Sequence, residues 1–126
     1  MNLIEFLGIE TVKQTAEQVV LRLPVTDQLK QPFGLVHGGI NAVLAETAAS
    51  LGANESARAW HKIAVGVDLE VHHLRAVQAG VLEATATPIH AGKTVQAWQV
   101  ELTETTKQVV TASATVTLLL QKQARV

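Results

Sequence analysis

The sequence predicts an α+β fold in which an antiparallel sheet wraps around one central helix, and three patterns support this prediction. Residues 38–54 place apolar side chains three and four positions apart, which is the spacing of an α-helix. From residue 63 onward, apolar residues recur at every second position, which is typical of β-strands. Two shorter strand-like segments precede the helix. Because the helix is apolar on one side and lined with alanines on the other, we expect a curved sheet to bury it almost all round.

The segment before this helix predicts one short helix and two short strands. Residues 2–7 fit an amphipathic helix that Gly8 would end. Residues 9–13 and 18–23 fit strands, the second of which has a clear apolar alternation. Residues 26–34 are mostly polar and contain a proline and a glycine, so we expect an irregular loop there.

The long helix of residues 38–54 should be ended by Gly52, Asn54 and the polar run to Arg58, which interrupt the apolar pattern. The strands that follow are separated by short connections rich in glycine or polar residues. Short connections favour antiparallel pairing between strands that are neighbours in the sequence. The expected strands are residues 63–72, 81–89, 94–102 and 109–120.

The composition predicts a single domain that associates with copies of itself. A chain of 126 residues is of the usual length for one domain, here residues 1–126. Hydrophobic residues make up 48% of it, which is much for a small domain with a large surface relative to its volume. Apolar surface that remains after folding favours an oligomer.

Several classes of function are disfavoured by what the sequence lacks. Without cysteine there is no disulfide, thiol nucleophile, Cys-ligated zinc site or iron–sulfur cluster. A formal net charge of −1, with two Trp, two Phe and no Tyr, argues against a nucleic-acid-binding surface. No apolar run approaches the ~20 residues of a membrane span, and Glu5 and Glu10 precede any basic residue, unlike in a signal peptide. We therefore expect a cytoplasmic protein that binds neither nucleic acid nor membrane.

Glu46 lies near the middle of the predicted helix and is the first candidate for chemistry. A carboxylate among apolar residues is costly to ionise unless it is paired or solvated, so a functional role as general base or nucleophile is one explanation. Ser50 follows four residues later, about 40° around the helix axis, and points into the same region. The alternative is an interface glutamate whose partner lies on a neighbouring chain.

The start of the helix, His37-Gly38-Gly39, is the second candidate. The first N–H groups of a helix have no partner within the helix and carry a partial positive charge, so they can hold a carbonyl oxygen or an oxyanion. Two glycines would let such a group approach the backbone closely. The alternative is an ordinary turn into a helix, in which His37 caps the first turn.

The remaining polar residues give weaker signals. His72 and His73 are adjacent in a predicted strand and face opposite sides of it, so a metal site is not expected. Ser50 lacks the glycine pattern of a serine-hydrolase nucleophile. Basic residues at strand ends could hold phosphates or could simply be solvated; they are Arg75 and His73 after one strand, and His90 and Lys93 around the next turn.

At these residues the sequence resembles the hotdog-fold acyl-CoA thioesterases. The branch it resembles includes the 4-hydroxybenzoyl-CoA thioesterases that use a helix glutamate and the 1,4-dihydroxy-2-naphthoyl-CoA hydrolases of menaquinone biosynthesis. The resemblance extends over about residues 3–120. The segments that carry it are residues 31–39 (QPFGLVHGG), 44–50 (LAETAAS), 65–75 (VGVDLEVHHLR) and 88–93 (PIHAGK).

The resemblance implies a hydrolase with active sites at the subunit interface of a homodimer, commonly paired into a homotetramer, and with no cofactor, since CoA is part of the substrate. Glu46 would attack the thioester carbonyl or activate water, and the N–H of Gly38, rather than that of Gly39, would polarise the carbonyl. Gln31, His37 and Ser50 would orient the substrate, the water or the departing thiolate. The positions implied to contact CoA are Gly66, His73, Leu74, Arg75, Ala76, His90, Ala91, Gly92, Lys93, Thr94 and Val95.

Two departures from the family pattern bear on specificity. Ile40-Asn41 replaces the pair of small residues often found after His-Gly-Gly, and Ala76 stands where serine is frequent. An aromatic acyl group fits the resemblance, but the scarcity of aromatic residues leaves an aliphatic one open. Two other functions remain alternatives: a hotdog hydratase or dehydratase with His37 as acid/base, and a non-catalytic acyl-CoA-binding module.

Overall fold

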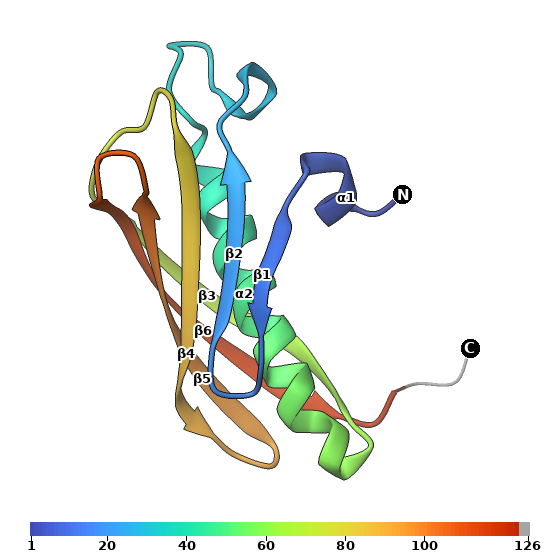
Figure 1. Ribbon diagram of the computed structural model, residues 1–126. Helices are drawn as coiled ribbons and strands as arrows, with labels where there is room; N and C mark the ends of the chain where they lie inside the picture. The colour runs from blue at the N-terminus through green and yellow to red at the C-terminus, as the bar shows by residue number, and fades with distance from the viewer. Residues whose placement is uncertain (124–126) are drawn as a thin grey trace.

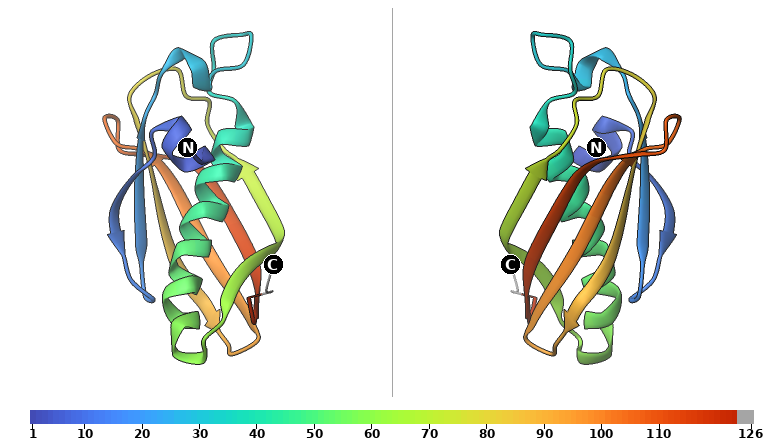
Figure 2. Two further views of the ribbon diagram at one scale, coloured as in Figure 1. Left: turned by 90° about the vertical axis from the view of Figure 1, so that its right-hand side faces the viewer. Right: turned by 90° about the vertical axis from the view of Figure 1, so that its left-hand side faces the viewer.

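A six-stranded antiparallel sheet curves around one long helix, as the sequence predicted (Figures 1 and 2). This computed structural model describes residues 1–123. The helix α2 spans Gly38–Ala57, and a short helix α1, Leu3–Leu7, precedes the sheet. The strands are β1 (Glu10–Gln14), β2 (Val19–Pro24), β3 (Ile63–His73), β4 (Val81–Ala91), β5 (Val95–Glu104) and β6 (Val109–Gln121). One-turn 3-10 helices, Asp27–Leu29 and Arg58–Trp60, lie before and after α2.

The strand order β1-β2-β4-β5-β6-β3 corrects one expectation from the sequence. Strands β3 and β4 are neighbours in the sequence, but β3 pairs with β6 at the far edge and β4 pairs with β2. The connection, residues 74–80, has the length to cross from one side to the other. Its backbone accepts or donates hydrogen bonds at Thr111 of β6, at Val36 before α2 and at Val25 after β2. These hydrogen bonds hold residues 74–80 in place as they cross from β3 at one edge to β4. The rule that short connections join paired strands does not anticipate such a crossing.

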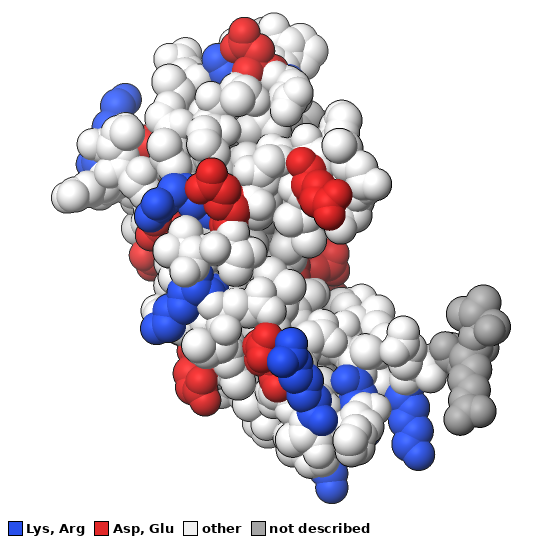
Figure 3. All heavy atoms as spheres, turned by 45° about the vertical axis from the view of Figure 1, so that its right-hand side comes forward, with Lys and Arg blue, Asp and Glu red and all other residues white. Residues whose placement is uncertain are grey.

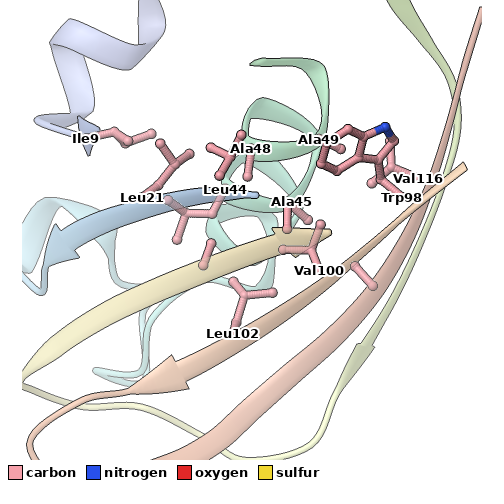
Figure 4. Close-up of a cluster of buried hydrophobic side chains, with 14 of the residues drawn as sticks. Ile9, Leu21, Leu44, Ala45, Ala48, Ala49, Trp98, Val100, Leu102 and Val116 are labelled. Carbon is pink, nitrogen blue, oxygen red and sulfur yellow. The ribbon is translucent and has the colours of Figure 1, made fainter. Parts of the chain in front are cut away.

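The alanines of α2 face the sheet and form the centre of the core. All of them except the partly buried Ala42 are fully buried against apolar side chains of the strands, among which the indole of Trp98 is the largest (Figure 4). Small side chains let the sheet approach the helix closely, and Gly52 is the extreme case, because a Cβ there would overlap the Trp98 ring. The buried residues of the helix are Asn41, Leu44, Ala45, Ala48, Ala49, Gly52, Ala53 and Ala57.

Two expectations about α2 need correction. The helix is not buried all round within one chain, because Glu46 is exposed and Val43 and Leu51 are only partly buried. It also continues to Ala57, three residues beyond the predicted helix of residues 38–54. Asn54 is accommodated because its side-chain amide bonds to the backbone N–H and C=O of Ala64 on β3, at 2.9 and 3.3 Å.

The residues at the two ends of α1 explain where this helix begins and ends. The side chain of Asn2 accepts a hydrogen bond from the N–H of Glu5 at 3.0 Å, and Gly8 ends the helix in the left-handed conformation at φ +79°. Glycine reaches this conformation without the steric cost that a Cβ brings. The helix of residues 2–7 that the sequence predicted is thus confirmed within one residue.

Charged side chains of both signs are interspersed on the face shown in Figure 3, with no continuous basic stripe there. Among residues 1–123, no helix combines the length and the apolar character that crossing a membrane requires.

Candidate active site

The predicted site residues lie at three levels along α2: at its N-terminus, near its middle and beside its C-terminal end. The axial rise of an α-helix is about 1.5 Å per residue, so the twenty residues of α2 extend over about 30 Å. The three levels are therefore distinct places in one chain.

At the N-terminus of the helix, the backbone N–H groups of Gly38, Gly39 and Ile40 differ in their partners among residues 1–123. The N–H of Gly39 donates to Nδ1 of His37 at 2.8 Å, so His37 caps the helix, as one of the two interpretations of this turn expected. The N–H of Ile40 donates to the backbone oxygen of His37. Within residues 1–123, the N–H of Gly38 has no such acceptor. The geometry thus separates the two glycines, and Gly38 keeps the free donor.

The ring of His73, at the end of β3, lies directly over this turn. A Cβ on Gly38 would lie 2.9 Å from both Cε1 and Nε2 of His73, so glycine is needed for the ring to lie there. Nδ1 of the same ring lies 3.0 Å from Nδ2 of Asn41, one turn into α2. Asn41 is 8% exposed and was not among the predicted site residues.

A cavity of about 360 Å³ opens at this end of the helix. It brings together six predicted site residues from three segments of the chain: the loop before α2, the first helical residue and the end of β3 with the residues after it. They are Gln31, Gly38, His73, Leu74, Arg75 and Ala76, and Asn41 lines the same cavity. The side-chain oxygen of Gln31 accepts a hydrogen bond from the N–H of Phe33, which holds the loop in a tight turn.

Glu46 and Ser50 share a second cavity of about 200 Å³ near the middle of α2. Glu46 is exposed, and its carboxylate extends over Gly66 on β3, where any Cβ would overlap Oε1. The structure therefore places Gly66 against Glu46, at the point where the pairing of β3 with β6 shifts register between Gly66 and Asp68. The other lining residues are Ile4 of α1 and Thr47, Leu51 and Asn54 of α2.

The third group lies at the opposite end of α2, in the turn between β4 and β5. The Gln96 side chain donates to the hydroxyl of Ser56 at 3.0 Å and to the backbone oxygen of Gly92 at 3.2 Å, which ties the turn to the last turn of the helix. Lys62 donates to the backbone oxygen of Lys93 at 2.9 Å. Within one chain, this turn is thus far from Gly38 and Glu46. The predicted residues in the turn and at the strand ends beside it are His90, Ala91, Gly92, Lys93, Thr94 and Val95.

Gly38 and Glu46 are themselves separated. Eight residues of helix correspond to about 12 Å along the axis. A carbonyl oxygen within hydrogen-bond distance of the Gly38 N–H and a carbonyl carbon within attack distance of Glu46 require the two groups to lie within about 6 Å of each other. In one chain, the backbone positions of the two residues are about 12 Å apart along the axis, about twice this distance.

Two further features lie outside the predicted set. A cavity of about 580 Å³ lies beside the 74–80 connection, and its lining includes Arg75, Ala76, Glu104 and Lys107. Within the part of the chain that the structure describes, no three His, Cys, Asp or Glu residues are grouped as metal ligands would be.

Comparison with known proteins identifies the relatives of this arrangement. Residues 33–117 match the family model described as Thioesterase superfamily. The chain is 42% identical to a 1,4-dihydroxy-2-naphthoyl-CoA hydrolase of Listeria monocytogenes over 113 residues, which cover 90% of this chain and 91% of that protein. A Staphylococcus aureus thioesterase structure with a glutamine-to-alanine substitution is 30% identical with TM-score 0.91, covering 96% of this chain and 99% of that chain. A thioesterase structure from Haemophilus influenzae is 32% identical with TM-score 0.86, covering 97% and 84%.

Proposed function

Because this chain belongs to the thioesterase superfamily and is a thioester hydrolase with the hotdog fold, we propose that it hydrolyses an acyl-CoA to the free acid and CoA with Glu46 as the reacting group. The observation that carries this proposal is the exposed carboxylate of Glu46 in a cavity with Ser50, on the helix whose first residue keeps a free N–H. A carboxylate and a backbone donor suffice for thioester hydrolysis without cysteine or a metal ion.

Two routes are compatible with this site. In the nucleophilic route, a Glu46 oxygen bonds to the carbonyl carbon, the C–S bond breaks, and CoA leaves as a thiolate that takes a proton from solvent. Water then hydrolyses the acyl–glutamate anhydride and restores the carboxylate. In the general-base route, Glu46 removes a proton from water as the water oxygen bonds to the carbon, and that proton passes to the departing thiolate. In both routes negative charge develops on the carbonyl oxygen, which the N–H of Gly38 would stabilise.

The functional unit in this proposal is a homodimer. The distance of about 12 Å between Gly38 and Glu46 along the helix of one chain favours a site that takes its N–H from one chain and its carboxylate from the other. A two-fold arrangement with antiparallel α2 helices would also bring the β4–β5 turn of one chain, residues 91–95, near the helix N-terminus of its partner. CoA would then extend between that turn and the residues around Arg75. Pairing of two such dimers would give the homotetramer that the resemblance implies.

The remaining predicted residues have supporting roles in this site. Ser50, one turn after Glu46, would orient the attacking water or the thiolate. Gln31, held by its bond to the N–H of Phe33, lines the cavity beside Gly38 and would orient the thioester. His37 caps the helix and thereby leaves Gly38, not Gly39, available to the substrate.

The acyl group that we propose is aromatic, with 1,4-dihydroxy-2-naphthoyl as the first candidate and menaquinone biosynthesis as the corresponding pathway. The support is the 42% identity to a hydrolase of that substrate. The walls of the Glu46 cavity are aliphatic or polar, including Ile4, Thr47 and Leu51, so they offer no ring for stacking. An aliphatic acyl group is therefore the second candidate.

A hydratase would use the His37 ring as an acid/base group. In this chain Nδ1 of that ring already accepts the helix-capping hydrogen bond, which favours a structural role for His37. A non-catalytic binding module would hold acyl-CoA without releasing thiol.

The test follows CoA release from benzoyl-, 1,4-dihydroxy-2-naphthoyl- and medium-chain acyl-CoA. We expect release by the wild type and a loss of about 100-fold or more in kcat in Glu46→Ala and Glu46→Gln. Glu55→Gln is the matched control, because Glu55 lies on the same helix and pairs with Arg58. No release from any substrate overturns the thioesterase proposal, and full activity of Glu46→Ala overturns the site. Turnover of an enoyl-CoA without thiol release identifies a hydratase instead.

A further inference from the structure

Asn41 is a buried polar residue that the mechanism above does not use. Its side chain faces the ring of His73, with Nδ2 of the amide 3.0 Å from Nδ1 of the imidazole. At 8% exposure, the amide has little access to water, so its hydrogen bond to the ring is its main polar contact in this pocket. The contact joins the first turns of α2 to the end of β3.

This contact selects one form of the histidine ring. A neutral imidazole carries its proton on one nitrogen and accepts on the other. The amide nitrogen of asparagine only donates, so Nδ1 of His73 must accept and the proton must lie on Nε2. The Cε1–Nε2 edge is also the one that lies against Gly38, where a Cβ would be 2.9 Å away.

The cavity at the start of α2 thus contains two N–H donors close together. One is the backbone N–H of Gly38, which has no acceptor among residues 1–123, and the other is Nε2–H of His73. Neither donor carries a formal charge, and both belong to groups held in place, by the helix in one case and by Asn41 in the other. Two fixed donors directed at one oxygen are what stabilises the charge that develops on a thioester carbonyl.

We propose that Asn41 is a positioning residue that holds His73 in the tautomer protonated at Nε2, so that this N–H joins the Gly38 N–H in binding the thioester oxygen. The part that concerns the thioester rests on the proposed function. The part that concerns the ring stands on the contact itself and is measured separately. Asn41 acts through His73 and touches no reacting atom.

The first experiment reads the tautomer directly. Protein labelled with ¹⁵N in histidine is examined by NMR at about pH 9, well above the ordinary histidine pKa, so that rings are neutral. His73→Gln identifies the His73 signals. We expect Nδ1 of His73 to be unprotonated in the wild type, and a mixture of tautomers in Asn41→Ala. Asn41→Asp is nearly isosteric but presents only acceptors, so we expect the proton to move to Nδ1.

Glu70→Gln is the matched control for these spectra. Glu70 bonds to the ring of the neighbouring residue His72 at 2.9 Å, and adjacent residues of a strand point to opposite faces of the sheet, so His73 faces away from this pair. We expect it to change the His72 signals and leave those of His73 unchanged. A wild-type ring protonated at Nδ1, or a His73 tautomer that Asn41→Ala does not alter, overturns the inference.

The second experiment asks whether the ring state matters for turnover. With the best acyl-CoA substrate, we expect Asn41→Ala to lower kcat about 10-fold with KM changed less than about 2-fold, because the lost donor acts on developing charge. In a His73→Ala background, Asn41→Ala should not lower kcat any further, since Asn41 acts through the His73 ring. An equal loss in both backgrounds means that Asn41 acts by another route and overturns the proposal.

The two experiments separate the inference from the proposed function. If no acyl-CoA is hydrolysed by the wild type, the proposed function and the role at the thioester fail together, while the spectra still decide whether Asn41 sets the tautomer. If hydrolysis occurs and the Asn41 variants keep both tautomer and kcat, the function stands and the inference fails. The unfolding temperature of each variant, compared with that of the nearly isosteric Asn41→Asp, shows whether a loss of activity reflects a loss of folded protein.

Discussion

Gly66 is the residue whose identity depends most directly on the proposed site. It lies where the pairing of β3 with β6 shifts register and where the Glu46 carboxylate lies on the strand, and a Cβ there would overlap Oε1. The chain conformation at Gly66 has no positive φ that would demand glycine. Besides the irregular pairing of the strand at this point, the feature that a side chain on Gly66 would disturb is the space that the carboxylate occupies.

Gly66→Ala should consequently impair activity more than stability. We expect kcat to fall about 10- to 100-fold, because a displacement of about 1 Å is sufficient to misalign a reacting group, while the unfolding free energy changes by less than about 1 kcal/mol, since the carboxylate can turn toward solvent. Steady-state kinetics and urea unfolding measure the two effects. Combined with Glu46→Gln, the substitution should have no further effect on kcat; an additive loss would show that Gly66 acts elsewhere.

At the same scale, the sequence alone pointed to Glu46, Ser50 and the pair Gly38-Gly39 as candidates, because polar residues in an apolar helix and glycines at its start are visible in the pattern. It did not pair Asn41 with His73 or Gly66 with Glu46. In the sequence, Asn41 is notable only because Ile40-Asn41 replaces the small residues that often follow His-Gly-Gly in the family. Its partner His73 is distant along the chain, and the pairing depends on β3 lying beside α2, which no local pattern encodes.

At the scale of elements, the turn between β5 and β6 is organised by one buried carboxylate. Glu104 is 3% exposed, and its oxygens accept hydrogen bonds from the side chain and N–H of Thr106, from the N–H of Val81 and from that of Lys107. These bonds, led by the Thr106 hydroxyl, lower the pKa of Glu104 from 4.5 to about 2, against the smaller effect of burial. The same carboxylate thus joins the β5–β6 turn to the start of β4.

The pKa of Glu104 predicts how stability depends on pH. Because the folded value lies below the unfolded one, the ionised carboxylate stabilises the fold above about pH 4.5, and this contribution is lost as the pH falls toward 2. We expect Glu104→Gln to unfold at lower urea concentration at pH 7, with the difference from the wild type shrinking between pH 4.5 and 2. Glu101→Gln, an exposed position on the same strand, is the control. A difference that is constant with pH would contradict this explanation.

The packing of α2 on the sheet gives a second prediction at this scale. Alanine is the better helix former, yet a methyl group on Gly52 would overlap the Trp98 ring. We expect Gly52→Ala to lower the unfolding free energy by about 1–3 kcal/mol, as overpacking in cores does. Combining it with Trp98→Leu should remove most of that cost, as measured by urea unfolding against the Trp98→Leu single variant. If Gly52→Ala costs as much in the Trp98→Leu background, the overlap is not its cause.

The elements themselves were largely predictable, and the exceptions have physical reasons. The alternation of apolar residues located β2, β4, β5 and β6, because one face of each of these strands is buried. In contrast, β1 is exposed along its whole length, and Val65 and Val67 of β3 are exposed although they belong to its apolar alternation. The partner of β3 was not predictable, since it depends on where the 74–80 connection forms hydrogen bonds to other segments. The end of α2 was missed because Asn54 bonds to β3, which lets the helix continue through a polar run.

At the scale of the whole molecule, the distribution of the site over three levels of α2 is the feature that a single chain does not explain. Gly38 and Glu46 are eight residues apart on one rigid helix, about 12 Å along its axis. The surplus of apolar residues in the sequence and the partly exposed Val43 and Leu51 of α2 both favour a contact between chains. A site shared between two chains therefore explains both the surplus of apolar residues and the separation of Gly38 from Glu46, with the single assumption that the protein is a dimer.

This assumption predicts complementation between two inactive chains. Gly38→Pro removes the N–H at the first helical position, where proline is tolerated, and His37 already has the extended backbone, φ −62° and ψ 133°, that precedes proline readily. The His73 ring would have to turn aside, which also removes the second proposed donor. We expect this variant and Glu46→Gln each to lose about 100-fold or more in kcat as homodimers.

Mixed dimers distinguish the two possible arrangements of the site. If each site takes Gly38 from one chain and Glu46 from the other, a dimer of one Gly38→Pro chain and one Glu46→Gln chain contains one site with both defects and one site with none. Purified through two different affinity tags, such dimers should recover about half of the wild-type activity. If both groups of a site came from the same chain, each site of the mixed dimer would carry one defect and the activity would stay at the level of the homodimeric variants.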